Sequence, residues 1–275
     1  MRKTIDFLKQ HHIITAIIAV AVAFASTRLF VQDSIAIIAL LRILLTMTMS
    51  MFVYLISREK TFENCHTTTG YVFRWGLVTI IFELILFVGF IGTLFSGESV
   101  AAAGWPTRLL LAIVACIFVG LFEELTFRAV INDALLYSFR NNKHIFIWIA
   151  VVSSLVFGAV HVIGPNMFSS GAITGTLLKT VSTAISGLCW LILYWKTRNI
   201  WGIALIHGLC DFTTFIQSAI TETTAKLGGA ENYSNTGAIG NGIYIAQIVF
   251  SLIALIILWN KIGKKIDFEE IRNNW

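Results

Sequence analysis

Three charged residues lie together in a stretch that otherwise has the character of a membrane-spanning helix. Glu123, Glu124 and Arg128 follow the uncharged run 109–122. An ionisable side chain at the centre of a spanning helix costs about 2.5–3.5 kcal/mol on insertion scales, so such a residue usually has a function. Glu124 and Arg128 are four positions apart on one helix face, which predicts a buried ion pair. Glu123 is turned about 100° from Glu124 and is left for chemistry; the alternative is that all three form one helix-stabilising cluster.

Two further polar pairs lie within predicted spans. Phe157 precedes His161 by four positions and His207 precedes Asp211 by four, so the members of each pair share a helix face. A lone buried histidine is usually a satisfied core residue. Polar groups on three separate helices at membrane depth, with Glu123 among them, favour a common site.

These residue types permit a narrow chemistry. A carboxylate and a neutral imidazole can hold a water molecule and take its proton. A second imidazole, oriented by a carboxylate one turn further on, can donate to an oxyanion. The pattern therefore predicts a water-activating hydrolase. A nucleophile with an adjacent base is not evident, because Ser153 and Ser154 lie two turns before His161 and Cys210 has only Asp211 beside it.

The composition predicts an all-α, polytopic membrane helical bundle. Of the 275 residues, 57% are hydrophobic and 13% are charged, and the mean hydropathy is +0.80. No linker-like segment divides the chain, so residues 1–275 are expected to form a single membrane domain. The net charge of +5 is explained by Lys and Arg in cytoplasmic loops, and no nucleic-acid partner is predicted.

The hydropathy pattern predicts about eight transmembrane helices. They are expected at about 13–29, 34–56, 71–95, 107–130, 145–163, 173–194, 200–220 and 243–259. With an inner N-terminus, every inner segment carries a Lys/Arg cluster, so both termini are expected to be cytoplasmic. The sequence Ala23-Phe24-Ala25 leaves open a cleaved signal peptide in place of the first span.

Other polar or reactive residues are weaker candidates. Glu83 either lines the same cavity or faces a polar partner elsewhere in the bundle. The cysteines form no CxxC pair and are expected to be small buried hydrophobes rather than a disulfide frame. They are Cys65, Cys116, Cys189 and Cys210.

The three motifs, taken in order, resemble those of the CAAX protease and bacteriocin-processing (CPBP) intramembrane proteases, which include prenyl-protein endopeptidases and the so-called abortive-infection proteins. The resemblance covers residues about 107–220, the expected catalytic core. The matching segments are Glu123-Glu124-Leu125-Thr126-Phe127-Arg128, Phe157-Gly158-Ala159-Val160-His161 and His207-Gly208-Leu209-Cys210-Asp211.

The resemblance implies a role for each residue. Glu123 and His161 would bind and deprotonate the attacking water, and His207 and Asp211 would form the oxyanion pole. Position 211 is Asp where the prenyl-protein proteases tend to have Asn. An ionised Asp211 is a poor oxyanion donor, so it must be protonated or must orient His207. Glu124 and Arg128 would brace the helix, and Phe157 would shape the pocket.

Metal dependence is open at the level of sequence. The family has been described both as metalloprotease and as glutamate-type protease. Glu123, His161 and His207, with Asp211, offer ligands for zinc, although the HExxH pattern of soluble zinc proteases is absent. Positions along the predicted spans place Glu123 and His207 toward the inner side and His161 toward the outer side. We expect a water-filled cavity that opens to the cytoplasm.

The sequence thus predicts an intramembrane endopeptidase that cleaves a membrane-associated peptide or a prenyl (CAAX-type) protein. The compact chain favours a bacterial cytoplasmic membrane, and the substrate and the oligomeric state are not specified. Two alternatives remain: a catalytically silent scaffold or immunity protein that binds a peptide or sensor partner, and a transporter with a proton relay. The inverted repeats typical of transporters are not seen.

Overall fold

A computed structural model describes residues 2–29, 34–58, 60–63, 67–163, 172–221 and 237–274. Every regular element in these ranges is a helix, which confirms the predicted all-α class. The organisation of residues 1–275 as one domain stays a prediction. In chain order the elements are α1 (Arg2–Gln10), α2 (His12–Leu29), α3 (Ile35–Ser57), α4 (Lys60–Glu63), α5 (Thr69–Gly76), η1 (Leu77–Ile80), α6 (Ile81–Phe95), α7 (Trp105–Glu124), η2 (Leu125–Ile131), α8 (Asn132–Phe139), α9 (Ile145–Val160), α10 (Ala172–Thr197), α11 (Ile200–Thr221), α12 (Gly237–Lys261), η4 (Gly263–Lys265) and α13 (Phe268–Asn273).

The described part of the chain holds somewhat fewer candidate spanning helices than the roughly eight predicted. Among the described residues, six helical stretches are long and apolar enough to cross a membrane, or seven if α1 and α2, bent by 104°, form one span. The predicted span 145–163 is reduced to α9, which has 16 residues. At about 1.5 Å per residue α9 is about 24 Å long, shorter than the ~30 Å hydrocarbon core.

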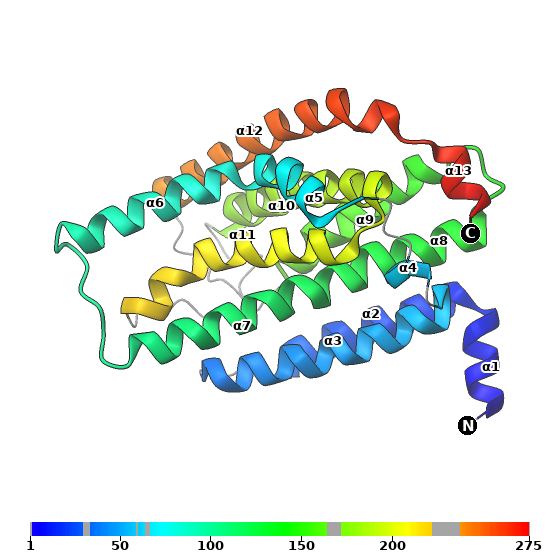
Figure 1. The fold of residues 1–275 in the computed structure, drawn as a ribbon, viewed down its shortest axis with the longest axis horizontal. Helices are drawn as coiled ribbons and strands as arrows, with labels where there is room; N and C mark the ends of the chain where they lie inside the picture. Colours follow the sequence, from blue (N-terminus) through cyan, green and yellow to red (C-terminus); the bar gives the residue numbers. More distant parts are fainter. Residues whose placement is uncertain are drawn as a thin grey trace.

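The helix α7 runs between α3 and α11 (Figure 1). It packs against α3 on one side and α11 on the other, while α10 packs against α9 and α12. Its start is set locally, since Gly104 has a φ of 74° and Pro106 follows in the first turn, where proline is favoured. This arrangement surrounds the C-terminal end of α7 with neighbouring helices.

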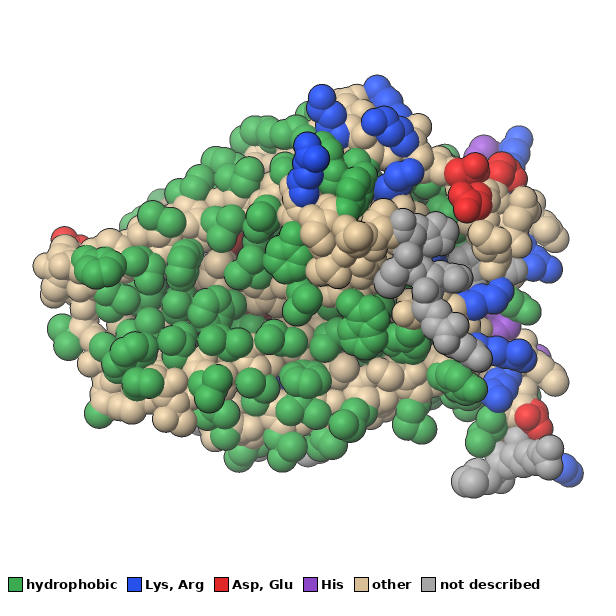
Figure 2. Space-filling model, viewed as in Figure 1, with side chains coloured by type: hydrophobic (Ala, Val, Ile, Leu, Met, Phe, Trp, Pro, Cys, Tyr) green, Lys and Arg blue, Asp and Glu red, His purple; other side chains and the backbone are tan. Residues whose placement is uncertain are grey.

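The surface of the bundle separates by residue type. Hydrophobic side chains cover most of the face shown in Figure 2, and Lys and Arg gather toward the end where both chain termini lie in Figure 1. An apolar belt of this extent suits contact with lipid rather than with water. The location of both termini at one end agrees with an even number of spans, and the cytoplasmic assignment of that end stays a prediction.

Glycines allow α7 and α11 to approach closely. A Cβ atom added at Gly120 of α7 would lie 2.3 Å from the Ala204 carbonyl oxygen and 2.7 Å from the Gly208 nitrogen. One added at Gly208 of α11 would lie 2.8 Å from the Cys116 oxygen. Small residues on facing helices permit such contacts between backbones in membrane proteins. Because Glu123 and His207 lie beside these glycines in sequence, the contact also sets the distance between the two helices at the polar residues.

Replacement of Gly120 by alanine should therefore destabilise the bundle. The added methyl group meets backbone atoms that cannot rotate away, so we expect the free energy of unfolding to fall by about 1–3 kcal/mol. Thermal or denaturant unfolding in detergent measures the change. Gly89→Ala is the matched control, because a Cβ there meets nothing within 4 Å. Equal effects of the two substitutions would contradict the close contact.

Candidate active site

The predicted acidic pair lies at a change in helix type. Glu123 and Glu124 are the last two residues of α7, and the π-helix η2 begins at Leu125. The predicted span 107–130 lies within the continuous helical stretch Trp105–Phe139, whose turns from Leu125 to Ile131 are π-helical. A π-helical turn widens the backbone spiral and is frequent at functional sites. Here it changes the direction of the side chains that follow the two glutamates.

Glu124 links two other members of the predicted site. Its Oε2 lies 3.1 Å from Arg128 Nε, and its Oε1 lies 2.8 Å from His207 Nδ1. Glu124 and Arg128 are fully buried. Arg128 Nη2 also donates to the Gly187 carbonyl oxygen at 3.1 Å, and the guanidinium lies 4.8 Å from the centre of the Phe157 ring. Glu124 and Arg128 thus make the predicted ion pair, and Glu124 also holds His207.

Glu123 faces both histidines. Its Oε2 lies 3.3 Å from His161 Nε2 and 3.6 Å from His207 Nε2. Asp211 Oδ2 lies 3.8 Å from the same His207 Nε2. Side chains from α7, from the C-terminal end of α9 and from α11 therefore converge on one point. Positions along the predicted spans had put His161 in the outer half of the membrane and His207 in the inner half. Glu123 is partly exposed, so the point of convergence is open to a small molecule.

Hydrogen bonds determine which ring nitrogen of each histidine faces Glu123. His161 Nδ1 lies 2.6 Å from the Phe157 carbonyl oxygen, which can only accept, so Nδ1 carries the hydrogen. His207 Nδ1 donates in the same way to the Glu124 carboxylate. The Nε2 atom of each ring is consequently the one directed at Glu123. A neutral His161 therefore presents a proton-accepting nitrogen beside the carboxylate.

Aromatic rings enclose the histidines. Phe157 lies 4.6 Å from the His161 ring and 5.9 Å from the His207 ring, measured between centroids. Trp190 of α10 lies 4.2 Å from the His207 ring, and its indole nitrogen donates to Thr79 Oγ1 at 3.0 Å. Gly187 leaves room for Phe157, since a Cβ there would lie 2.7 Å from the Phe157 ring. These rings fix the orientations of the imidazoles and exclude water behind them.

Two residues at the site were missed by sequence reasoning. Trp190 gives no signal in an apolar helix, because tryptophan is common in such segments. Arg42 could have been found by the criterion that drew attention to Glu123, since it is a lone charge in the apolar helix α3. It is buried, and it interacts electrostatically with Glu123 and Asp211.

The weaker candidates have other environments. Glu83 is buried and accepts a hydrogen bond from Gln247 at 2.7 Å, so it has the polar partner in the bundle that was one of its two expected roles. Cys116 and Cys189 are buried free thiols, and Cys210 is partly buried. Cys65 lies outside the described residues.

The side chains as placed do not fit a zinc site. In the described part of the chain, no three His, Cys, Asp or Glu side chains are positioned to hold a metal ion. The Nδ1 hydrogen bonds of His161 to a carbonyl and of His207 to Glu124 leave both Nε2 atoms available, as in histidines that bind a metal. The prediction of zinc bound by Glu123, His161 and His207 therefore stays a prediction that chelation would test.

Residues 103–213 match the family model described as type II CAAX prenyl endopeptidase Rce1-like. The segment is similar to that family, and we refer to it below as the Rce1-like domain. The resemblance predicted from the three motifs is confirmed, and the matched segment contains every predicted site residue from Glu123 to Asp211. No curated protein and no solved structure matches the chain. The Rce1-like domain supports intramembrane endopeptidase activity, and together with the apolar helices it indicates a multi-pass membrane protein.

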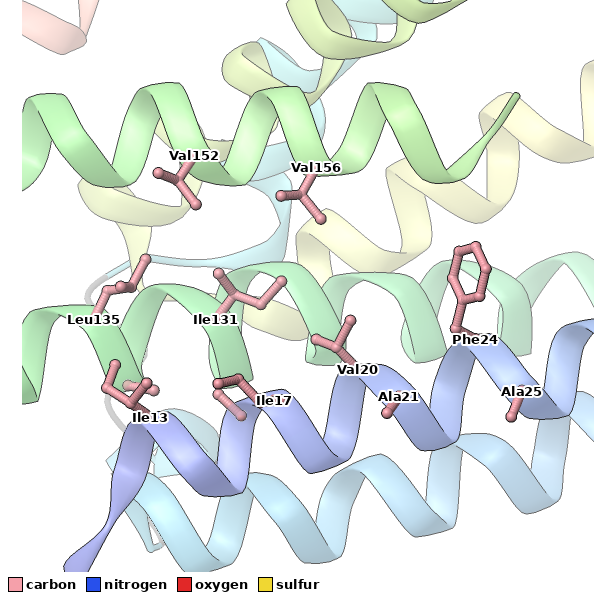
Figure 3. A pocket seen from close by; sticks show the side chains of 12 residues that line it. Ile13, Ile17, Val20, Ala21, Phe24, Ala25, Ile131, Leu135, Val152 and Val156 are labelled. Carbon is pink, nitrogen blue, oxygen red and sulfur yellow. The ribbon is translucent and has the colours of Figure 1, made fainter. Parts of the chain in front are cut away.

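An apolar groove runs beside the Rce1-like domain's central helices. It has a volume of about 640 Å³ and lies between α2, α9 and the helical segment that includes η2 and α8 (Figure 3). Its lining includes Ile17, Ala21 and Phe24 from α2, Ile131 from η2 and Val156 from α9. Val156 and Ile131 belong to the elements that carry Phe157 and Arg128, so the groove adjoins the packing around the site.

Removal of the Arg128 guanidinium should destabilise the protein strongly. Arg128→Met leaves the Glu124 carboxylate buried without its ion-pair partner, and breaking a buried pair from one side costs about 3–5 kcal/mol. Unfolding in detergent measures the loss. The double variant Glu124→Gln/Arg128→Met removes both charges and should be more stable than Arg128→Met alone. A double variant that is less stable than Arg128→Met would contradict the ion-pair role.

Proposed function

We propose that the protein is an intramembrane endopeptidase in which Glu123 and His161 activate a water molecule for attack on a peptide bond. The observation that carries the proposal is the convergence of Glu123 with the Nε2 atoms of His161 and His207, at 3.3 and 3.6 Å, inside an Rce1-like domain. A carboxylate beside an accepting imidazole is suited to removing a proton from water.

The reaction follows from the positions of these atoms. Water bound between Glu123 and His161 attacks the carbonyl carbon as its proton passes to one of these two groups. The carbonyl oxygen becomes an oxyanion, to which His207, protonated on both ring nitrogens, donates from Nε2. The tetrahedral intermediate collapses when the C–N bond breaks, and the stored proton goes to the leaving amine. Glu124 keeps the His207 ring in position through Nδ1.

The surroundings strengthen these interactions. The site is enclosed by Phe157, Trp190 and the buried Arg128–Glu124 pair, and a low local dielectric makes each charge more effective than it would be in water. Glu123 and His161 are partly exposed, whereas His207 is buried. Substrate and water therefore reach the Glu123–His161 side, and His207 is held behind it.

The substrate that we propose is a membrane-associated peptide or protein with an attached hydrocarbon chain. The groove formed by α2, η2, α8 and α9 is lined almost wholly by aliphatic and aromatic side chains, which suit a prenyl or acyl group. A chain held there would bring the adjoining peptide toward the elements that carry Phe157 and His161.

Substitution of the proposed water-activating residues should abolish cleavage. Glu123→Gln and His161→Ala each remove a proton acceptor, so we expect the rate of cleavage of a quenched-fluorescent peptide library to fall by about 10²–10⁴-fold. The library includes lipidated members, and the assay uses the purified protein in detergent. Glu83→Gln is the control, because it makes the same change at a buried glutamate that pairs with Gln247.

A chelator added to the wild-type assay tests the metal prediction. Loss of cleavage that returns with zinc would favour a metal-dependent enzyme, and cleavage that is unaffected would favour the side chains alone. Cleavage that survives both Glu123→Gln and His161→Ala would contradict the site assignment. A well-folded protein that binds library peptides without cleaving any of them would favour the silent scaffold.

Obstruction of the groove should affect lipidated substrates selectively. Ala21→Trp fills the space beside α9, so we expect a several-fold rise in KM for a prenylated peptide and no change for the same peptide without its lipid. Leu40→Trp on the exposed face of α3 serves as the control, because it adds the same ring outside the groove. An equal effect on both peptides would contradict a lipid-binding role for the groove.

A further inference from the structure

Arg42 is a buried cation that comes from outside the matched segment 103–213. It is the only charged residue of α3, and its side chain is 9% exposed. Its Nη1 atom has no hydrogen-bond partner. An arginine within an apolar helix is costly, and a buried guanidinium N–H without an acceptor adds to that cost. A buried arginine that is kept in spite of this cost, with an N–H donor to spare, is suited to bind a ligand or a substrate.

The position of Arg42 is fixed next to the acidic site. Thr46, one turn further along α3, donates to the Phe118 carbonyl oxygen of α7 at 3.1 Å. The Arg42 guanidinium lies 5.4 Å from the centre of the Phe122 ring. Phe122 is the residue immediately before Glu123 in sequence. It interacts electrostatically with both Glu123 and Asp211. Arg42 therefore belongs to a fourth helix that packs against α7 near the acidic residues.

The other arginines in the bundle interior have a different environment. Arg128 pairs with Glu124 at 3.1 Å and also donates to the Gly187 oxygen. Arg198 lies 3.5 Å from Asp133 Oδ1. Each has a carboxylate oxygen within 4 Å, which accounts for its burial. Arg128 Nη1 also lacks a hydrogen-bond partner, but among the described residues Arg42 differs in having no carboxylate oxygen within 4 Å.

The proposed reaction needs such a donor. An oxyanion is stabilised by N–H groups aimed at the oxygen, and an ionised Asp211 has only acceptors. Glu123 adds a second carboxylate at the same point. A His207 protonated on both ring nitrogens would have to stabilise the developing negative charge beside these two acidic side chains through Nε2–H alone. A guanidinium supplies both a positive charge and an N–H in this environment.

We propose that Arg42 is a further catalytic residue, whose guanidinium donates to the oxyanion of the tetrahedral intermediate and compensates for the acidic residue at position 211. The inference rests on the proposed endopeptidase function. As the water oxygen bonds to the carbonyl carbon, the π electron pair moves to the carbonyl oxygen, and Arg42 hydrogen-bonds to that oxygen. When the C–N bond breaks, this electron pair forms the C=O bond again. Arg42 itself neither gains nor loses a proton.

The first test is a kinetic comparison of Arg42→Gln and Arg42→Lys with wild type. Loss of an oxyanion donor lowers kcat by about 10²–10³-fold. We therefore expect the kcat of Arg42→Gln to fall by this factor, while its KM changes by less than about threefold. Arg42→Lys keeps the charge and should retain part of the activity. Arg74→Gln, an exposed arginine on α5, is the control and should leave kcat unchanged.

Two double variants distinguish a hydrogen bond donated to the oxyanion from a simple balance of the charge on Asp211. Asp211→Asn and Asp211→Leu both remove the carboxylate charge, but only Asn supplies an N–H at the same place. We expect Arg42→Gln/Asp211→Asn to recover at least about tenfold in kcat over Arg42→Gln, and Arg42→Gln/Asp211→Leu to recover nothing. Equal recovery in the two double variants would overturn the donor role.

The kinetics also distinguish the oxyanion from a substrate carboxylate, which is the other anion that Arg42 could bind. Peptides are assayed with a free C-terminal acid and with a C-terminal amide. Equal losses of kcat for both peptides support the proposal, whereas a rise in KM confined to the free acid overturns it. An Arg42→Gln variant with kcat within about threefold of wild type also overturns it, while the dependence on Glu123 still supports the endopeptidase. A wild-type protein that cleaves no peptide contradicts the endopeptidase itself and this inference with it.

Discussion

The site depends on one buried carboxylate. Glu124 is fully buried. Its Oε2 lies 3.1 Å from Arg128 Nε, and its Oε1 lies 2.8 Å from His207 Nδ1. A buried carboxylate is tolerated only when its charge is paired and its oxygens are hydrogen-bonded. The same contacts that stabilise the charge join α11 to the junction of α7 and η2 and turn His207 Nε2 toward Glu123. Stability and orientation of the reactive groups therefore rest on the same interactions.

Helix packing makes this arrangement possible. Gly120 and Gly208 bring the backbones of α7 and α11 into contact, and Gly187 admits the Phe157 ring beside the histidines. The change to π-helix after Glu124 redirects η2, which places Arg128 against Phe157 at 4.8 Å. Such a packed, water-excluding surround is what allows a few charged groups to act strongly at membrane depth. Small residues thus determine the distances between polar residues that are far apart in sequence.

The helical class and the residues that converge could both be predicted from the sequence, because polar and charged residues are conspicuous in apolar helices. It could not supply the change to π-helix at Leu125, which depends on packing around the turn, or the shortness of α9, because apolar composition does not mark where a helix ends. Trp190 was missed because its contact with the His207 ring is tertiary. Arg42 was visible by the same criterion as Glu123, and its relation to Asp211 required the fold.

Direct attack by water, with no covalent intermediate, is the central claim about the chemistry. It is tested most directly by a single turnover of a cleavable peptide in H₂¹⁸O containing hydroxylamine, with mass spectrometry of both the products and the protein. Activation of water by Glu123 and His161 predicts a new carboxylate that carries one ¹⁸O, no hydroxamate and no mass added to the protein. A hydroxamate product, or an acyl group attached to the protein at a residue such as Cys210, would contradict it.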